Sequence, residues 1–370
     1  MKSKDIYDII IEKITKDWND SMNKQIKNNS WETPRYSKNQ INKAGEVIAN
    51  PSSSKEDRDN ALVILNNWRA SHAYPLQVIC NNLRTRNPDA IVVQRLKRLD
   101  SITNKIKRFP HMNLYRMQDL GGCRVIVDNI SQVYKTVDNY KNSRIRHKLK
   151  KEKDYIQDPK ESGYRSYHMV YQFHSDKKET YNQNILIEIQ FRTKLQHIWA
   201  TAVEMMGIYT RSNLKASQGN EDILRFFTLV SSLFAIKEKM PVCPNTNDKI
   251  DELIKEVKDL DDKYRIILTL NAIKVSIDYT SNEKSTTKST YYILILDYSK
   301  KKISIKSFDS SKIEIATQAY AEIENECDQD VVLVSADSFT SLKEAYPNYF
   351  VDISKFSKMI RAIIKKHTKK

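Results

Sequence analysis

Two stretches of alternating sequence, SYHMVYQF (residues 166–173) and ILIEIQFRT (residues 185–193), decide the fold. Apolar and polar side chains alternate in both with the period of two that half-buried β-strands show, and a polar loop separates them. The polar face of the second stretch carries Glu188, Gln190 and Arg192. A carboxylate, an amide and a guanidinium on one strand face are unusual in a protein core, so this face is a candidate functional site.

The segments on either side alternate between helix and strand patterns. CRVIVD (residues 123–128) has the pattern of a buried strand. RLKRLDSITNKIKRF (residues 95–109), ISQVYKTVDNYKN (residues 130–142) and LQHIWATAVEMMGIY (residues 195–209) have helical patterns. We therefore predict an α+β fold in which helices flank a mixed sheet.

Different patterns precede and follow this core. Residues 1–84 are mostly helical in pattern, and residues 250 to about 279 also indicate a long helix. After that helix, YYILILDYSKKKISIKSF (residues 291–308) indicates a β-hairpin, followed by a helix, a short strand and a final helix. We predict an N-terminal helical region at 1–84, a central domain at 85–240 and a small C-terminal α+β domain at 241–370.

The composition favours polyanionic partners. There are 62 Lys and Arg residues against 46 Asp and Glu residues, a formal net charge of +16. The four cysteines lack a C-x-x-C spacing, so neither a zinc site nor a disulfide framework is indicated. The first residues carry charges throughout, and no apolar run approaches the length of a membrane span. We expect a soluble cytoplasmic protein that makes no membrane contact.

Basic side chains recur around residue 100. Lys97, Ser101 and Lys105 are spaced at i, i+4 and i+8, so on a helix two ammonium groups and a hydroxyl line one face. Such a row suits a triphosphate, and Arg95 at the same end can stack on a base. The alternative is an ordinary solvated basic face.

An aspartate precedes two glycines in RMQDLGGCRVIVD (residues 116–128). The glycines indicate a turn that leads into the buried strand, which puts Asp119 at a sheet edge where a metal-bound phosphate can dock. The alternative is that Asp119 only stabilises the turn. The stretch DYIQDPKESGYRSYH (residues 154–168) is equally open, because so many polar and aromatic side chains at a turn suit either phosphate chemistry or a solvated hairpin.

In combination and order these motifs resemble a known family. R-x-K-x-x-x-S-I-x-x-K, DLGGCRVI, DYIQDPKESGYRSYH, EIQFRT and QHIWA, spread over residues 95–209, resemble the RelA/SpoT synthetase domain of alarmone synthetases. The resemblance implies a RelA/SpoT nucleotidyltransferase-like mixed sheet and an ATP-dependent pyrophosphokinase. In that reaction the 3′-hydroxyl of an acceptor attacks the β-phosphorus of ATP, AMP leaves, and Mg2+ bridges phosphate oxygens.

The resemblance also assigns site residues at matching positions. Asp119 and Glu188 match the magnesium-site acids, and Glu188 is also the candidate general base. The matches to ATP-binding residues are Arg95 and Arg124 near the adenine and Lys97, Ser101 and Lys105 at the phosphates. The matches on the acceptor side are Lys160, Arg165, His168, Gln190, Arg192 and Tyr164, whose ring face would stack on the acceptor base.

The arrangement of a helical region, a synthetase core and a C-terminal α+β domain resembles the CapRel-type fused toxin–antitoxin proteins. Their pseudo-zinc-finger domain carries a Y-x-x-Y signature, and AYPNYF here supplies Tyr346 and Tyr349. The resemblance implies an autoinhibitory antitoxin or sensor domain over the ATP site. It also implies a toxin that pyrophosphorylates the 3′-CCA end of tRNA and blocks translation in anti-phage defence, with a phage protein as the trigger.

Two other functions fit the same residues. One is synthesis of (p)ppGpp or (p)ppApp from free GTP/GDP or ATP/ADP, which differs only in the acceptor. Ser162 stands where guanosine-tetraphosphate synthetases of the family usually have Asn, and this departure argues against a free guanine nucleotide. The other is a non-catalytic RNA or nucleotide sensor, for which both Asp119 and Glu188 would be unnecessary.

Overall fold

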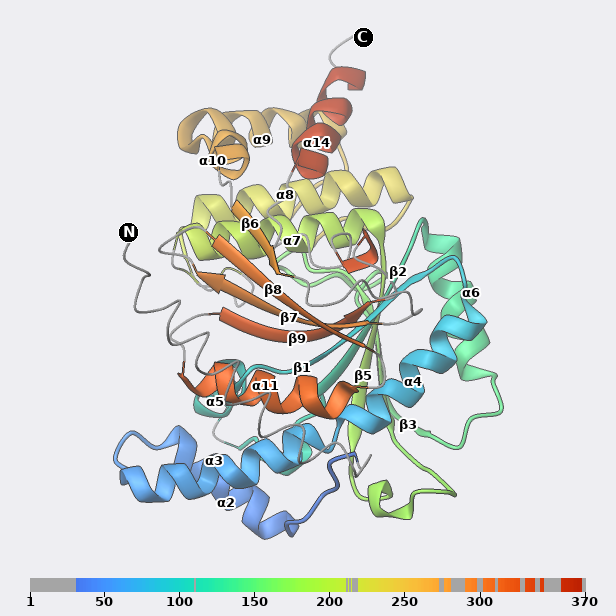
Figure 1. Cartoon of the computed structure of the whole chain (residues 1–370). Coiled ribbons are helices and arrows are strands. Elements are labelled where there is room, and N and C mark those ends of the chain that lie inside the picture. Colours follow the sequence, from blue (N-terminus) through green and yellow to red (C-terminus); the bar gives the residue numbers. More distant parts are fainter. Residues whose placement is uncertain are drawn as a thin grey trace.

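The computed structural model places one sheet between two groups of helices (Figure 1). It describes residues 31–109, 111–210, 212, 214, 219–272, 276–280, 290–297, 302–309, 312–326, 330–336, 340–342 and 354–367. The helix expected before residue 31 and the tyrosines at 346 and 349 lie outside the described residues.

The sheet contains both parallel and antiparallel pairs, so the predicted mixed sheet and α+β class are confirmed. Its strand order is β3-β4-β5-β2-β1-β9-β7-β8-β6. The β2–β5 and β6–β8 pairs are parallel, and the other pairs are antiparallel. The strands are β1 (Ile91–Leu96), β2 (Gly121–Val127), β3 (Lys148–Asp154), β4 (Tyr167–Gln172), β5 (Leu186–Thr193), β6 (Ser276–Thr280), β7 (Thr290–Asp297), β8 (Lys302–Asp309) and β9 (Asp330–Ala336).

Helices cover the sheet on both sides. In Figure 1, α2, α3, α4, α5 and α11 lie below the sheet, and α7 and α8 lie above it, with α9, α10 and α14 beyond them. None of the described helices combines the length and the hydrophobicity that a bilayer crossing needs. The helices are α2 (Lys38–Ala49), α3 (Lys55–Ala70), α4 (Ala73–Arg86), α5 (Leu99–Arg108), α6 (Ile130–Lys141), α7 (Lys194–Tyr209), α8 (Glu221–Glu238), α9 (Ile250–Tyr264), α10 (Ile266–Ala272), α11 (Ile313–Glu326) and α14 (Ser354–His367), with short 3-10 turns η1 (Leu114–Arg116) and η2 (Glu179–Tyr181).

The C-terminal strands continue the same sheet. Strand β9 pairs with β1, where Gln94 lies opposite Ser335 and Arg95 lies opposite Val334. The predicted hairpin is confirmed as β7 and β8, whereas residues 276–280, expected to end a long helix, form strand β6 beside β8. The predicted boundaries at 84/85 and 240/241 stay predictions, but no break in the sheet separates the central and C-terminal strands.

The segment expected to form one helix from residue 95 is divided between two elements. Residues 91–96 form β1, because this run pairs with β2 on one side and with β9 on the other. The helix α5 begins only at Leu99, and Ile102 and Ile106 on it are buried one turn apart in the main core. Lys97 therefore lies in the link between strand and helix, and the expected helical row of three side chains is wrong at its first member.

Candidate active site

The strand register places the predicted residues in rows on one face of the sheet. Arg95 on β1 lies opposite Gly122 on β2, and Gly122 lies opposite Glu188 on β5. Paired residues of adjacent strands share a face, so Arg95 and Glu188 flank a residue that has no side chain. Gly122 was expected in a turn, but it is part of β2, and the nearest atom to an added Cβ there would be the Arg95 carbonyl oxygen, 3.9 Å away. An open space therefore remains between the two side chains.

A second row lies one step further along the same strands. Arg124 on β2 pairs with Gln190 on β5, and Gln190 pairs with His168 on β4. A cavity of about 50 Å3 opens between the two rows. Its lining consists of Val93, Arg95, Asp119, Gly122, Cys123, Arg124, Glu188 and Gln190. The structure thus brings predicted ATP-site residues and both predicted acids to one small cavity.

Asp119 joins the two predicted phosphate-binding lysines. Its Oδ2 is 2.8 Å from Lys97 Nζ and its Oδ1 is 2.8 Å from Lys105 Nζ. Burial by itself would raise the pKa of Asp119, but the two ammonium groups outweigh it and lower the pKa to about 2. The cluster carries one more positive than negative charge beside the cavity, which favours an anion there. Ser101 lies one turn before Lys105 on α5 and is partly buried.

The acceptor-side residues form a closed hydrogen-bonded network, which we call the Tyr164–Glu188 network. Arg192 Nη2 donates to Tyr164 Oη (2.6 Å) and to Gln190 Oε1 (3.0 Å). Gln190 Nε2 donates to Glu188 Oε2 at 2.7 Å. His168 completes the circuit, with Nδ1 3.0 Å from Glu188 Oε1 and Nε2 2.7 Å from Tyr164 Oη.

The charges and hydrogen bonds of this network shift the pKa values of Glu188, His168 and Tyr164, each in the direction that favours the charged form. Burial opposes ionisation of Glu188, but the hydrogen bond and charge of His168 keep the pKa of Glu188 below its ordinary value. The pKa of His168 is raised against the effect of burial, because Tyr164 and Glu188 both favour the imidazolium. The pKa of Tyr164 is lowered to about 7 despite burial, because Arg192 and His168 lie beside its hydroxyl.

The predicted acceptor loop is held against α8. Gly163 adopts a φ of 85°, and an added Cβ would lie 2.9 Å from both Ser231 and Trp199. Ser231 Oγ donates to the Gly163 carbonyl oxygen at 2.6 Å. Only glycine combines this left-handed backbone with so close an approach to the helices. The sequence had indicated a turn at Gly163, and the structure adds the packing that requires it.

Arg165 is separate from the cavity. Its guanidinium is buried and donates to Ser231 Oγ at 3.1 Å and to the Ile156 carbonyl oxygen at 3.1 Å, with Cys243 Sγ at 3.4 Å. These contacts tie both ends of the loop to α8 and to the segment after it. The structure therefore does not bring Arg165 to the other acceptor-side residues, and its contacts are those of a residue that fixes the loop.

Cations lie over the ring of Tyr164. Lys160 Nζ is 5.3 Å from the ring centroid, and Arg192 Cζ is 5.0 Å from it. Lys160 also lies 4.6 Å from the ring of Tyr155, an aromatic neighbour that the sequence argument had not singled out. The hydroxyl of Tyr164, which base stacking would not use, is bonded on both sides. The hydroxyl therefore belongs to the Tyr164–Glu188 network, whereas stacking of the ring on an acceptor base stays a prediction.

The chemistry of the two acids fits a magnesium ion that would be coordinated partly by the protein and partly by a substrate phosphate. Among the described residues, no group of three or more His, Cys, Asp or Glu side chains is arranged to hold a metal. Magnesium at phosphate sites commonly takes one or two carboxylates and completes its shell with phosphates and water. Asp119 and Glu188 line one cavity, and the charge of Asp119 acts on Glu188 by raising its pKa.

Comparison with known proteins identifies a family whose model matches the segment that contains this site. Residues 94–213 match the family model described as "Region found in RelA / SpoT proteins". All the predicted site residues except the two C-terminal tyrosines fall inside that segment. The predicted resemblance to RelA/SpoT synthetase domains is therefore confirmed for this part of the chain, whereas the fused toxin–antitoxin subtype stays a prediction.

The individual relatives are bacterial synthetases. The chain is 35% identical over 122 residues to the GTP pyrophosphokinase YjbM of Bacillus subtilis, and 32% identical over 127 residues to YwaC of the same organism. These matches cover 31% and 33% of the chain but only 54% and 59% of the relatives, so the chain spans little more than half of their length. Small alarmone synthetase 1 from B. subtilis, solved with its product pppGpp, is 24% identical with a TM-score of 0.39, covering 46% of this chain and 89% of that one.

A titration of His168 should reveal its contact with Glu188. Because the pKa of His168 in the folded protein is raised above the ordinary value of about 6.5, its protonation stabilises the fold. That contribution is complete below about pH 6.5 and is lost as the pH rises through the raised pKa. Glu188→Gln should lower the pKa of His168, measured by NMR of histidine-labelled protein. The half-buried His174, which lies beside Asp176 and not beside Glu188, serves as the internal control, and an unchanged His168 titration would contradict the contact.

Proposed function

We propose that the chain transfers pyrophosphate from ATP to the 3′-hydroxyl of a nucleotide acceptor. The observation that carries this proposal is that one cavity is lined by Arg95, Arg124, Asp119 and Glu188 together. Beside it, Lys97 and Lys105 are paired with Asp119. Phosphoryl-type transfer depends mainly on positioning and on neutralising phosphate charge. Cations and carboxylates gathered at one sheet face provide both.

In the proposed reaction each group has a distinct task. Arg95 and Arg124 bind the adenine side of ATP, and Lys97 and Lys105 bind its phosphates, with Ser101 beside them. Asp119 and Glu188 would hold Mg2+, which would supply positive charge that neutralises the phosphates. The acceptor oxygen forms a bond to the β-phosphorus, the bond to the AMP oxygen breaks, and Glu188 accepts the hydroxyl proton. His168 and Gln190 orient that carboxylate through their bonds to its two oxygens.

Asp119→Asn and Glu188→Gln should each reduce transfer by about a hundredfold or more, because each removes a charge that the metal and phosphates require. The measurement is the movement of label from γ-labelled ATP to the acceptor, at matched protein concentration and melting temperature. Lys365→Gln, on the exposed side of α14, is a control that should keep the wild-type rate. A folded variant of either acid with an undiminished rate would remove that acid from the site, whereas a folded wild-type protein that transfers no label would favour the non-catalytic sensor.

The acceptor that we propose is the 3′-CCA end of a tRNA. Edge strand β3 has the sequence KLKKEKD and is exposed along almost all its length. Lys151 and Lys153 pair with Val170 and His168, so both lysines lie on the same sheet face as Glu188. No ion pair in the described part of the chain involves Lys148, Lys150, Lys151 or Lys153. Unpaired lysines on this edge strand, one strand away from β5 and its Glu188, favour a chain of phosphates, because each neutralised phosphate adds affinity.

A free guanine nucleotide is the second candidate acceptor. It is supported by the relatives named GTP pyrophosphokinase, which share 32–35% identity with the chain over the matched segment. The network of Tyr164, His168 and Arg192 suits a base and its phosphates in either case. The two acceptors differ in the length of polyanion that must be held beside the site.

Charge reversal on β3 should separate the two acceptors. If the acceptor is tRNA, Lys151→Glu/Lys153→Glu should lower transfer to tRNA by about tenfold or more and weaken its salt dependence. The same variant should use GTP or GDP almost as well as wild type. Lys365→Glu/Lys366→Glu on α14 makes the same change in net charge far from β3 (Figure 1) and is the matched control. Equal losses in both double variants would leave only an effect of overall charge.

We further propose that the C-terminal region silences the enzyme as an antitoxin, to be released by a phage protein in anti-phage defence. Tyr346 and Tyr349 would cover the ATP site. Support comes from Leu342, which is fully buried in one cluster with Val93, a residue of the cavity lining. The chain four residues before the first tyrosine thus lies on the same face of the sheet as the cavity.

Tyr346→Ala/Tyr349→Ala should therefore arrest growth on expression, without any trigger. Adding Glu188→Gln should restore growth, because the arrest would need transfer activity. Colony formation under an inducible promoter measures both effects, with solubility and melting temperature checked in parallel. A soluble, normally melting double variant that leaves growth unaffected would contradict the autoinhibition.

A further inference from the structure

The helix that carries the phosphate-binding side chains takes its N-terminal cap from the far end of the chain. Helix α5 starts at Leu99, and its N-cap residue, Arg98, makes no side-chain capping bond. Instead the Leu99 N–H donates to Glu324 Oε1 at 2.9 Å, across 225 positions of sequence. A carboxylate at a helix N-terminus both accepts an otherwise unpaired N–H and interacts favourably with the helix dipole.

Glu324 is fixed in place by two other side chains. Its Oε2 is 2.5 Å from Arg69 Nη1 on α3, and the Tyr320 hydroxyl donates to Oε1 at 2.7 Å. The side chains of Arg69 and Glu324 are only 4% and 10% exposed, and the guanidinium lies 5.0 Å from the Tyr320 ring centroid. A carboxylate this buried needs all of its partners. The position of its capping oxygen is therefore set by α3 and α11 together.

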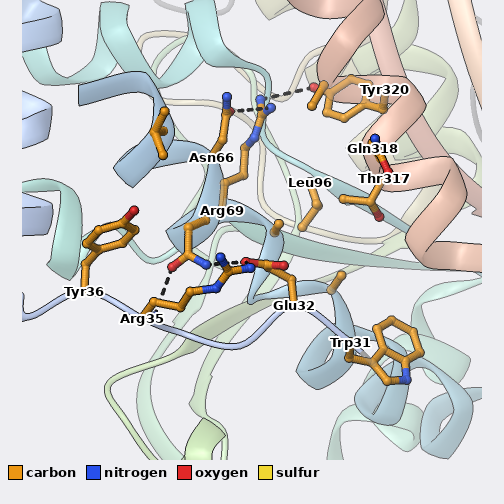
Figure 2. A pocket seen from close by; sticks show the side chains of 15 residues that line it. Trp31, Glu32, Arg35, Tyr36, Asn66, Arg69, Leu96, Thr317, Gln318 and Tyr320 are labelled. Carbon is orange, nitrogen blue, oxygen red and sulfur yellow. Dashed lines mark hydrogen bonds and ion pairs between the residues drawn. The ribbon is translucent and has the colours of Figure 1, made fainter. Parts of the chain in front are cut away.

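A cavity of about 700 Å3 opens between α3 and α11, and Arg69 of α3 and Tyr320 of α11 both line it. Figure 2 shows Arg69 and Tyr320 meeting at one end of the cavity, with Arg35 and Trp31 on its other wall. α11 itself is packed on the sheet through Tyr320 and its neighbours. Because Glu324 lies on α11 and is paired with Arg69 on α3, any movement of α11 relative to α3 would change the position of the Glu324 carboxylate.

Helix α5 in turn sets the position of the charged cluster. Lys105 on α5 and Lys97 just before it hold the two oxygens of Asp119. The buried Ile102 and Ile106 fix one side of the helix in the core, and the Leu99 side chain packs against the same core. The bond from the Leu99 N–H to Glu324 adds a polar contact at the first turn, which also contains Ser101.

We infer that Glu324 is a positioning residue for the ATP phosphates. It acts through the first turn of α5 and places that turn under the control of the C-terminal region. The inference rests on the proposed function, since it assigns ATP phosphates to Lys97, Ser101 and Lys105. It goes beyond that function because it makes the C-terminal region part of the working site, whether or not that region also inhibits.

The experiment compares two variants that differ only in the capping oxygen. Arg69→Met/Glu324→Gln keeps an acceptor for the Leu99 N–H, whereas Arg69→Met/Glu324→Met lacks one. Both have lost the buried ion pair, and Gln and Met are similar in size. The measurements are hydrogen exchange of the α5 amides, affinity for a non-hydrolysable ATP analogue, and melting temperature. If the double variants do not fold, Glu324→Gln and Glu324→Met are compared with Arg69 retained.

We expect about fivefold faster exchange in the first turn of α5, and about fivefold weaker binding of the ATP analogue, in the Glu324→Met member of the pair. Equal exchange and equal affinity in the two variants would overturn the inference. Faster exchange with unchanged affinity would also overturn it, because Glu324 would then only stabilise the helix. Failure of the wild-type protein to bind the analogue would instead count against the proposed function, and the exchange data would still report on the cap.

Discussion

The bonds from Asp119 to Lys97 and Lys105 are the constraint on which the site depends. They attach α5 to the paired strands β1 and β2, because Lys105 lies on α5, Lys97 directly follows β1 and Asp119 lies just before β2. A largely buried carboxylate between two ammonium groups is stable only while all three stay close, since removing one partner leaves a charge uncompensated. The same bonds hold two cations beside the cavity in advance, so the proposed binding of phosphates there would need little reorganisation.

Local pattern was enough to predict the parts of the fold that local forces determine. Strands β4 and β5 follow from the period-two alternation of residues 166–193, and Glu188, Gln190 and Arg192 do share one face. The β7–β8 hairpin is likewise a short-range feature. The cavity could not be predicted from local pattern alone, because it depends on how the strands pair. It is the register of β1, β2 and β5 that brings Arg95, Gly122 and Glu188 into line.

What the sequence could not supply depends on partners that are distant in the chain. Residues 91–96 became a strand because β2 and β9 pair with them, although a helical pattern begins at residue 95. Arg165 was expected to contact the acceptor, and nothing in its local sequence indicated that its guanidinium would instead contact Ser231 and Cys243. Nor does any local signal link Leu99 to Glu324. In each case tertiary contacts overrode a reading that was reasonable for an isolated segment.

The pairing of β1 with β9 has a consequence for how the protein is made. Arg95 pairs with Val334, so the strand that carries it keeps an open edge until the ribosome has added the C-terminal strands. At about 5–20 residues per second that interval is on the order of ten seconds or more. During it the nascent chain already contains the other strands of the candidate site, β2, β4 and β5, beside an edge that can pair with another chain. Completion of the sheet therefore closes an aggregation-prone edge and completes the sheet that carries the candidate site in the same event.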